Sequence, residues 1–452
     1  MPITITKGLD IPIKGAPRQS VKPSNPVSHV ALLGRDYIDL KPSMSVQVGD
    51  KVALGQTLFI DKKNPGVCFT APASGEVIAI NRGARRSFES LVIKVDDERQ
   101  ISFTTPELIA GQQEHKADAI RDLLIASGLW TSLRTRPFGK IPRIQAHPEA
   151  IFVNAMDTLP LAADPETVIN LSSDLFALGL RKIQQLAPKT YLCAKKGATI
   201  AGQHMPGITT KRFAGPHPAG LPSTHIHFLC PVSPGKEVWH IDYQDVIAMG
   251  HLFRSGSLLE TKVIAIAGPG IKKPRLIKTR PGASLNELCA NETTSEECRL
   301  ISGSVLTGHR AEGASAYLGR YHHQITALPE GNGSSLFSWL RPGRNRFSIL
   351  PIFLSAFDDL SLKRRKTITN TATWGGRRAI FPLGTYEKVM PLDIIATSLL
   401  KSIATGNTEK AAELGCLELV EEDLALCSFV CPGKNNFGPM LRQTLQTIEK
   451  EG

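Results

Sequence analysis

The chain has 452 residues, of which 42% are hydrophobic, 21% charged and 6% aromatic. At roughly 100–200 residues per domain this length predicts about three or four domains, and the composition is typical of a folded rather than a disordered protein. Lys and Arg exceed Asp and Glu by 12, which leaves nucleic acid, anionic lipid or an acidic protein open as partners. The basic clusters are short and lack interleaved aromatic residues, so nucleic acid ranks last.

Membrane-spanning and export segments are not predicted. The longest nearly uninterrupted apolar stretch, residues 347–357 (FSILPIFLSAF), is about half as long as the roughly 20 residues that a membrane helix requires, and it contains a proline. The first residues, MPITITKGLD, lack the basic and apolar segments of a secretory signal. Eight scattered cysteines are too sparse for a disulfide framework. We therefore expect a reducing compartment and a chain that stays where it is made.

Residues 1–100 are predicted to form a small β-domain. Short apolar alternations between Met44 and Ile80 are punctuated by glycine-containing turns, a pattern typical of β-hairpins. The residues expected to line its interior are Val46, Val48, Val52, Leu54, Leu58, Ile60, Val77 and Ile80. The phrases VGDKVALGQTL and APASGEV resemble the two halves of the barrel-sandwich fold of biotinyl and lipoyl domains.

Those carrier domains hold their modified lysine at the tip of a tight hairpin between the two halves. Lys62 and Lys63 are the nearest candidates here, but the run from them to Gly75 is about two residues longer than such a hairpin leads us to expect. A plain surface turn is therefore favoured over attachment of a swinging arm.

Residues 101–257 carry the alternation of helix and strand patterns that is typical of an open α/β sheet. The predicted helices cover residues 114–128, 164–186 and 243–253, and the predicted strands cover residues 150–155, 190–194 and 227–232. The first two strands and the helical segment between them form a βαβ unit. Sheets of this class bind ligands at the carboxyl ends of their strands.

The phosphate-binding loops of nucleotide-binding α/β domains are missing from this region. The sequence contains no GxGxxG, and no Gly-Lys pair is followed by Ser or Thr. Residues 127–142 resemble a region of the flavin-binding subunit of respiratory complex I and of the Rnf complex C subunit, where a glycine-rich loop holds a phosphate. Here that place reads Thr-Arg-Pro-Phe-Gly (135–139), and Pro137 removes an amide donor. The acid-rich pattern that follows in those relatives is reduced to Asp157. We infer a degenerate Rossmann-like domain that has lost flavin and NADH.

Residues 258–330 predict a β-grasp domain. Two strands separated by turns occupy residues 262–283, and Ser284 and Glu287 form a capping box at the start of a helix, followed by another strand in residues 299–308. This order resembles the soluble-ligand-binding β-grasp domain of the same two relatives.

A connecting segment and a helical domain are predicted for residues 331–452. Apolar residues from Leu392 to Ile403 recur with helical spacing, Gly406 is placed to end that helix, and Pro439 begins another.

No catalytic residue, metal ligand or cofactor-binding residue is predicted. Cys427 and Cys431 look like the last two cysteines of a ferredoxin-type run, but a [4Fe–4S] cluster needs four ligands and Cys416 lies at the wrong interval. A relic is favoured over a cluster, and a two-cysteine metal site between protein chains stays open. His225 and His227 are expected to share a strand face, yet no acidic or cysteine partner has ligand spacing to them.

Taken together, these phrases resemble one family: the A subunit of the sodium-translocating NADH:quinone reductase of bacteria. The resemblance runs from KGLDIPIKGAP (7–17) to EEDLALCSFVCPGK (421–434) and IEKEG (448–452). It implies a peripheral position on the cytoplasmic face of the bacterial inner membrane, in a six-subunit complex that couples electron flow from NADH to ubiquinone with Na⁺ export. NADH, the flavins and the iron–sulfur centres are then held by partner subunits, and no nucleic acid is bound.

The resemblance further implies that the chain contacts the membrane-embedded B subunit, contributes to the site of ubiquinone and is not catalytic in isolation. The basic clusters at residues 134–143 and 272–280 are the candidates for the docking face. The competing hypothesis is a free-standing flavin-dependent NADH oxidoreductase or biotinyl carrier, which would be yellow or carry a lysine adduct.

Overall fold

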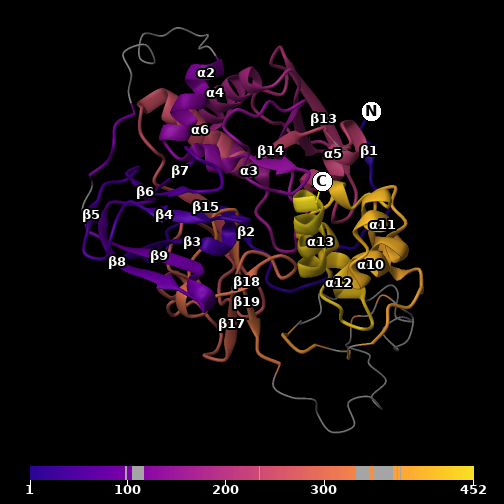
Figure 1. Ribbon diagram of the computed structural model, residues 1–452. Helices are drawn as coiled ribbons and strands as arrows, with labels where there is room; N and C mark the ends of the chain where they lie inside the picture. Colours follow the sequence, from indigo (N-terminus) through magenta and orange to yellow (C-terminus); the bar gives the residue numbers. More distant parts are fainter. Residues whose placement is uncertain are drawn as a thin grey trace.

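The computed structural model describes most of the chain, namely residues 1–96, 99–103, 117–233, 235–331, 347, 349, 370–373, 375–376 and 378–451. The apolar stretch at 347–357 therefore lies outside the described residues apart from Phe347 and Ile349, as do the first three residues of the helix predicted at 114–128. Within these limits, no helix has the length and apolar character that a membrane crossing requires. Figure 1 shows two large sheets, a pair of small sheets and a cluster of helices near the C-terminus.

Two small sheets form the predicted barrel sandwich, with strand orders β3-β9-β8-β5 and β4-β6-β7. Their strands are β3 (His29–Leu33), β4 (Pro42–Met44), β5 (Lys51–Val52), β6 (Thr57–Asp61), β7 (Cys68–Thr70), β8 (Gly75–Arg82) and β9 (Phe88–Val95). Val52, Leu58 and Val77 are fully buried between them. The prediction for Val48 is wrong, because this residue precedes Gly49, whose φ is positive, and is 58% exposed.

The α/β region is built on a six-stranded sheet of order β1-β13-β12-β11-β14-β10. Its strands are β1 (Ile3–Thr4), β10 (Arg134–Arg136), β11 (Ile151–Ala155), β12 (Thr190–Lys195), β13 (Ile208–Ala214) and β14 (Val238–Asp242). All pairs are parallel except β10 with β14. β11 and β12 are connected through α3 (Pro165–Asn170) and α4 (Ser173–Ile183), so the βαβ prediction is confirmed.

Helices α2 (Ala117–Ala126), α4 and α6 (Tyr243–Ser255) lie together beside this sheet (Figure 1). α4 and α6 approach closely because each has a glycine at the crossing: a Cβ on Gly179 would collide with the carbonyl of Val246, and one on Gly250 with the carbonyl of Leu175. This close contact packs α4 and α6 against each other beside the sheet.

The strand predicted at residues 227–232 is wrong, because this part of the chain forms helix α5 (Pro222–Leu229). Pro222 occupies the first turn, where its fixed φ favours a helix and its missing N–H costs nothing. The imidazoles of His225 and His227 consequently do not share a strand face. His225 is buried and bonds to the carbonyl of Ala219, whereas His227 pairs with Glu418.

The β-grasp region contains a second six-stranded sheet, of order β18-β17-β19-β15-β16-β2. Its elements are β2 (Arg18–Lys22), β15 (Lys262–Ala267), β16 (Arg275–Thr279), α7 (Leu285–Leu288), β17 (Cys298–Ser302), β18 (His309–Arg310) and β19 (Gln324–Pro329). β2 pairs in parallel with β16, so the N-terminal segment extends this sheet.

The capping box predicted at α7 forms only in part. The hydroxyl of Ser284 accepts a hydrogen bond from the Glu287 amide at 3.5 Å, as predicted. The carboxylate of Glu287 instead accepts from the amides of Ser28 and His29, at 2.8 and 3.2 Å. The Glu287 carboxylate does not bond to the Ser284 amide, because that amide already donates to the carbonyl of His29.

The C-terminal region is helical, as predicted, with α9 (Thr385–Val389), α10 (Ala396–Thr405), α11 (Thr408–Glu413), α12 (Ala425–Val430) and α13 (Phe437–Glu451). Leu399, Leu400 and Ile403 of α10 are buried, and Gly406 ends that helix in the left-handed conformation. The fold class is thus confirmed as a multidomain α/β and α+β protein, while the domain limits at residues 100, 257 and 330 stay predictions.

Candidate functional site

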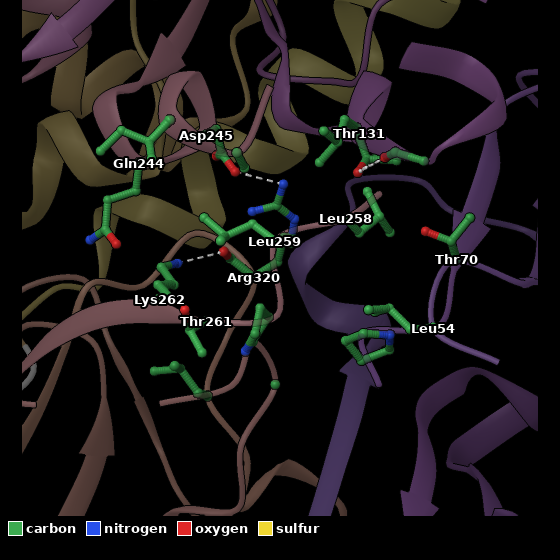
Figure 2. A pocket seen from close by; sticks show the side chains of 18 of the residues that line it. Leu54, Thr70, Thr131, Gln244, Asp245, Leu258, Leu259, Thr261, Lys262 and Arg320 are labelled. Carbon is green, nitrogen blue, oxygen red and sulfur yellow. Dashed lines mark hydrogen bonds and ion pairs between the residues drawn. The ribbon is translucent and has the colours of Figure 1, made fainter. Parts of the chain in front are cut away.

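A cavity of about 450 Å³ lies where the barrel sandwich, the α/β region and the β-grasp region meet. Segments far apart in the sequence line it: Asp36 and Tyr37 after β3, Thr131 after α2, the start of α6, the chain entering β15, and Arg320 before β19. Figure 2 shows Gln244, Asp245, Lys262 and Arg320 close together at one part of this cavity.

The polar part of the cavity is a connected network. Arg320 pairs with Asp245 at 2.8 Å, and its side chain also donates to the hydroxyl of Ser132 at 2.6 Å. The backbone amide of Arg320 donates to the carboxylate of Asp36 at 2.7 Å, and the Lys262 ammonium donates to the Arg320 carbonyl at 3.0 Å. Hydrogen bonds and an ion pair around Arg320 therefore connect residues from three regions of the chain.

Asp36 and Lys262, two groups of this network, have pKa values shifted toward neutral pH. Burial raises the pKa of the Asp36 carboxyl to about 6, although the hydrogen bond from Arg320 opposes the shift. Burial lowers the pKa of the Lys262 ammonium to about 8, although the carboxylates of Asp245 and Asp242 oppose it. Ionisable groups that titrate near neutral pH beside a cavity are typical of functional sites.

The rest of the lining is chiefly apolar. Leu54 and Phe69 come from the barrel sandwich, whereas Leu258 and Leu259 come from the connection between α6 and β15. A chiefly apolar cavity of this size with a few convergent polar groups is the usual form of a small-molecule site. We therefore take this cavity as the candidate functional site.

A smaller cavity of about 320 Å³ lies at the carboxyl ends of β11 and β12, lined by Asp157, Asp164, Glu166 and Lys195 among others. Burial raises the pKa of Asp157 to about 7, and the neighbouring carboxylate of Asp242 adds to the shift. This is the edge at which sheets of this class bind ligands. Asp157, the acid expected from the sequence, thus lies at the predicted edge but outside the larger cavity.

Residues 135–140, which stand where related domains have a phosphate-binding loop, form hydrogen bonds within their own segment. The Gly139 amide donates to the Thr135 carbonyl at 3.0 Å, and the Lys140 amide donates to the Thr135 hydroxyl at 3.2 Å. The carbonyl of Phe138 accepts from Arg442 of α13 at 2.7 Å. Amides committed in this way cannot close around a phosphate.

The expectation that residues 134–143 form a docking face is wrong for Arg136. Its side chain is fully buried and donates to the Ser223 hydroxyl at 3.0 Å, and it lies 3.4 Å from the carboxylate of Glu422. His240 Nε2 lies 2.9 Å from the guanidinium. The cationic group therefore joins the α/β region to the helical region instead of facing solvent. The second cluster, residues 272–280, includes Arg275 and Arg280, which pair with Glu292 and Glu260.

The cysteines singled out in the sequence, Cys416, Cys427 and Cys431, are buried free thiols in the helical region. Burial raises the pKa of the Cys427 thiol to about 12. The sulfur of Cys431 accepts a hydrogen bond from the hydroxyl of Tyr386 at 3.2 Å. In the part of the chain that the structure describes, His, Cys, Asp and Glu side chains form no group of three or more suited to a metal ion.

The sequence did not single out Asp36, Lys262 or Arg320. The available signal was weak: Lys262 opens an otherwise apolar strand, KVIAIA, in which a charge is unusual. Neighbouring positions could not reveal that these three residues meet.

Family models cover most of the chain. Residues 3–96 match the model described as "NqrA N-terminal barrel-sandwich hybrid domain", residues 115–258 match "NqrA second alpha/beta domain", and residues 263–313 match "NQRA C-terminal domain".

Full-length relatives agree with these matches. The chain is 52% identical to the A subunit of the Na(+)-translocating NADH-quinone reductase of Pasteurella multocida, 53% identical to that of Actinobacillus pleuropneumoniae serotype 5b and 51% identical to that of Pseudomonas aeruginosa strain UCBPP-PA14; each comparison covers 100% of both chains. Among solved structures, a NAD⁺-reducing [NiFe]-hydrogenase in the H2-reduced state is 14% identical, with a TM-score of 0.38 over 77% of this chain and 63% of that one. A likeness of that degree carries no argument.

Proposed function

The chain belongs to the family of the A subunit of the Na⁺-translocating NADH-quinone reductase, and from this premise we propose that it lies peripherally on the cytoplasmic face of the membrane. In this role it holds the membrane-embedded B subunit, and it contributes a binding cavity for ubiquinone. The complex carries electrons from NADH to ubiquinone and exports Na⁺, while the flavins and iron–sulfur centres belong to partner subunits.

The observation that carries the quinone proposal is the 450 Å³ cavity between the three regions. A quinone has a flat ring with carbonyl acceptors and an apolar tail, and it needs hydrogen-bond donors at one end of its site and an apolar wall along the rest. Lys262 supplies a donor group, and Leu54, Phe69, Leu258 and Leu259 supply apolar wall. A cavity between about 300 and 1,000 Å³ is large enough for such a molecule.

Two features support the absence of a redox group in this chain. The amides of Thr135, Gly139 and Lys140 donate within their own segment, and among the described residues Cys427 and Cys431 have no third ligand to complete a metal site. The purified chain is therefore expected to be colourless. A flavin spectrum that persists through gel filtration would contradict this part of the proposal.

The cavity is tested by filling it. In Leu259→Trp the larger side chain occupies space that the quinone ring or tail needs, and the affinity of the purified chain for a short-chain ubiquinone should decrease at least about tenfold. Leu383→Trp is the matched control, because Leu383 is 49% exposed on the helical region and outside the cavity. Equal quinone affinity in both variants would argue against this site.

The role in the complex is tested by recovering the tagged chain from native membranes in mild detergent. We expect the B subunit to co-purify together with NADH-driven quinone reduction that Na⁺ stimulates. Recovery of the chain alone, with no partner protein and no such activity, would argue against the scaffolding role.

A further inference from the structure

Lys262 combines burial with incomplete hydrogen bonding. It begins β15, and only 9% of the residue is exposed. Its ammonium donates to the carbonyl of Arg320 at 3.0 Å. Across the described parts of the chain, no carboxylate lies close enough to form an ion pair with it. An ammonium has three N–H donors, and an unfilled buried donor costs free energy, so this group has capacity for a ligand.

The carboxylates near Lys262 have other partners. Asp245 pairs with Arg320 at 2.8 Å, Asp242 pairs with His323 at 3.0 Å, and Asp36 accepts from the Arg320 amide. The charged and titratable groups that face the ammonium from the surrounding elements are Asp36, Asp242, Asp245, Arg320, His322 and His323. Positive and negative groups are thus mixed around the cavity, which suits a neutral acceptor at least as well as an anion.

The position of the ammonium matches a ligand with a carbonyl oxygen. Figure 2 shows Lys262 beside Thr261 at the polar part of the cavity, with Leu258 and Leu259 drawn as neighbours in its lining. A ring oxygen at this end would receive an N–H bond, while the remainder of the molecule would lie along the apolar wall. When the ring is reduced, negative charge develops on its oxygens, and a nearby cation stabilises that charge.

We propose that Lys262 is the residue that binds a carbonyl oxygen of the quinone ring in this cavity. The inference rests on the proposed quinone function and adds to it the contact that orients the ring. Arg320 and Asp245 act through Lys262: they hold the loop before β19 against α6, and so fix the carbonyl to which the ammonium is anchored.

The test measures quinone affinity of the full chain with a water-soluble short-chain ubiquinone. Lys262→Met keeps the length of the side chain and removes the ammonium, so binding should weaken about ten- to a hundredfold, the value of a hydrogen bond to a charged group. Lys273→Met is the matched control, because Lys273 is an exposed lysine between β15 and β16 and is not among the residues that line the cavity. Its affinity should equal that of the unmodified chain.

The second measurement is the pH dependence of quinone affinity in the unmodified chain. The ammonium has a pKa of about 8, so quinone affinity of the unmodified chain should decrease as the pH rises from 7 to about 9.5, because the neutral amine is a weaker donor. Lys262→Met should lose this decrease. If the variant does not fold, as seen by its thermal transition, the pH profile of the unmodified chain alone decides.

The outcomes separate the two proposals. No quinone binding by either the unmodified chain or Lys273→Met would overturn the quinone function, and with it the inference about Lys262. Quinone binding that is unchanged in Lys262→Met, or that is constant from pH 7 to about 9.5 in the unmodified chain, would overturn the inference while the quinone function stands.

Discussion

Replacing Arg136 by methionine should break the junction between the α/β region and the C-terminal helices. The guanidinium is fully buried, donates to Ser223 at 3.0 Å and lies 3.4 Å from the carboxylate of Glu422. Asp423, which is 8% exposed, also lies within electrostatic reach of Arg136. Methionine fills much of the same volume but leaves these polar groups without their cation.

The magnitude follows from this burial. Removing one partner of a buried, hydrogen-bonded charge pair costs about 3–5 kcal/mol, because the remaining charge stays desolvated. For a transition of a region of about 150–250 residues, each kcal/mol lowers the Tm by roughly 2–4 °C, so the variant should unfold about 6–20 °C earlier. The magnitude lies at the high end of single substitutions, as expected for a buried polar network.

The assay is differential scanning calorimetry at pH 7, with Arg143→Met as the control. Arg143 belongs to the same basic cluster but is exposed, so its replacement should change stability by no more than about 0.5 kcal/mol. Equal Tm values for the two variants would refute the argument that Arg136 is a structural cation.

Three further predictions concern other parts of the chain. Burial raises the pKa of Asp423 to about 7. Between about pH 4 and 7 this carboxyl is therefore protonated in the folded chain and ionised in the unfolded chain, so the free energy of unfolding should decrease as the pH rises through that window. Asp423→Asn should flatten the curve of Tm against pH there. Gly179→Ala should destabilise by about 1–3 kcal/mol in a denaturant titration, because the new Cβ meets the carbonyl of Val246, whereas Gly376→Ala, with open space around it, should change little. The mass of the native chain should match its sequence with no adduct on Lys62 or Lys63. Lys63 pairs with Asp39 at 2.8 Å, and the loop between β6 and β7 spans residues 62–67, which is longer than a tight two-residue turn. An added biotinyl or lipoyl mass would contradict this.

Sequence patterns predicted those helices and strands that depend on residues a few positions apart in the chain. The helix ending at Gly406 is visible because helical spacing of apolar residues and a left-handed glycine both act within a few positions. The same holds for β15 and β16, which are consecutive antiparallel strands joined by residues 268–274. Helix α5 was mistaken for a strand because it is short, its apolar residues have no clear period, and the significance of Pro222 depends on where the preceding loop ends.

The candidate site could not be predicted, because its residues are far apart in the sequence. Asp36, Lys262 and Arg320 meet only after three regions have packed together, and the one weak signal in the sequence, a lysine at the start of the apolar strand KVIAIA, names no partner. Arg136 was assigned to a basic surface cluster for the same reason, since a charged residue is expected at the surface unless a partner elsewhere in the chain neutralises it. That partner, Glu422, lies in the C-terminal region.

The contacts of the C-terminal helices explain why the ligand site is expected between domains instead of at the degenerate loop. Arg442 of α13 binds the carbonyl of Phe138, and a Cβ on Gly139 would touch Val420. Glu422 pairs with Arg136, so the helical region occupies the approach to this loop and engages its polar groups. A phosphate-bearing cofactor would have to displace these contacts and the hydrogen bonds within residues 135–140, whereas a quinone entering the larger cavity would fill space and satisfy a donor that is already there.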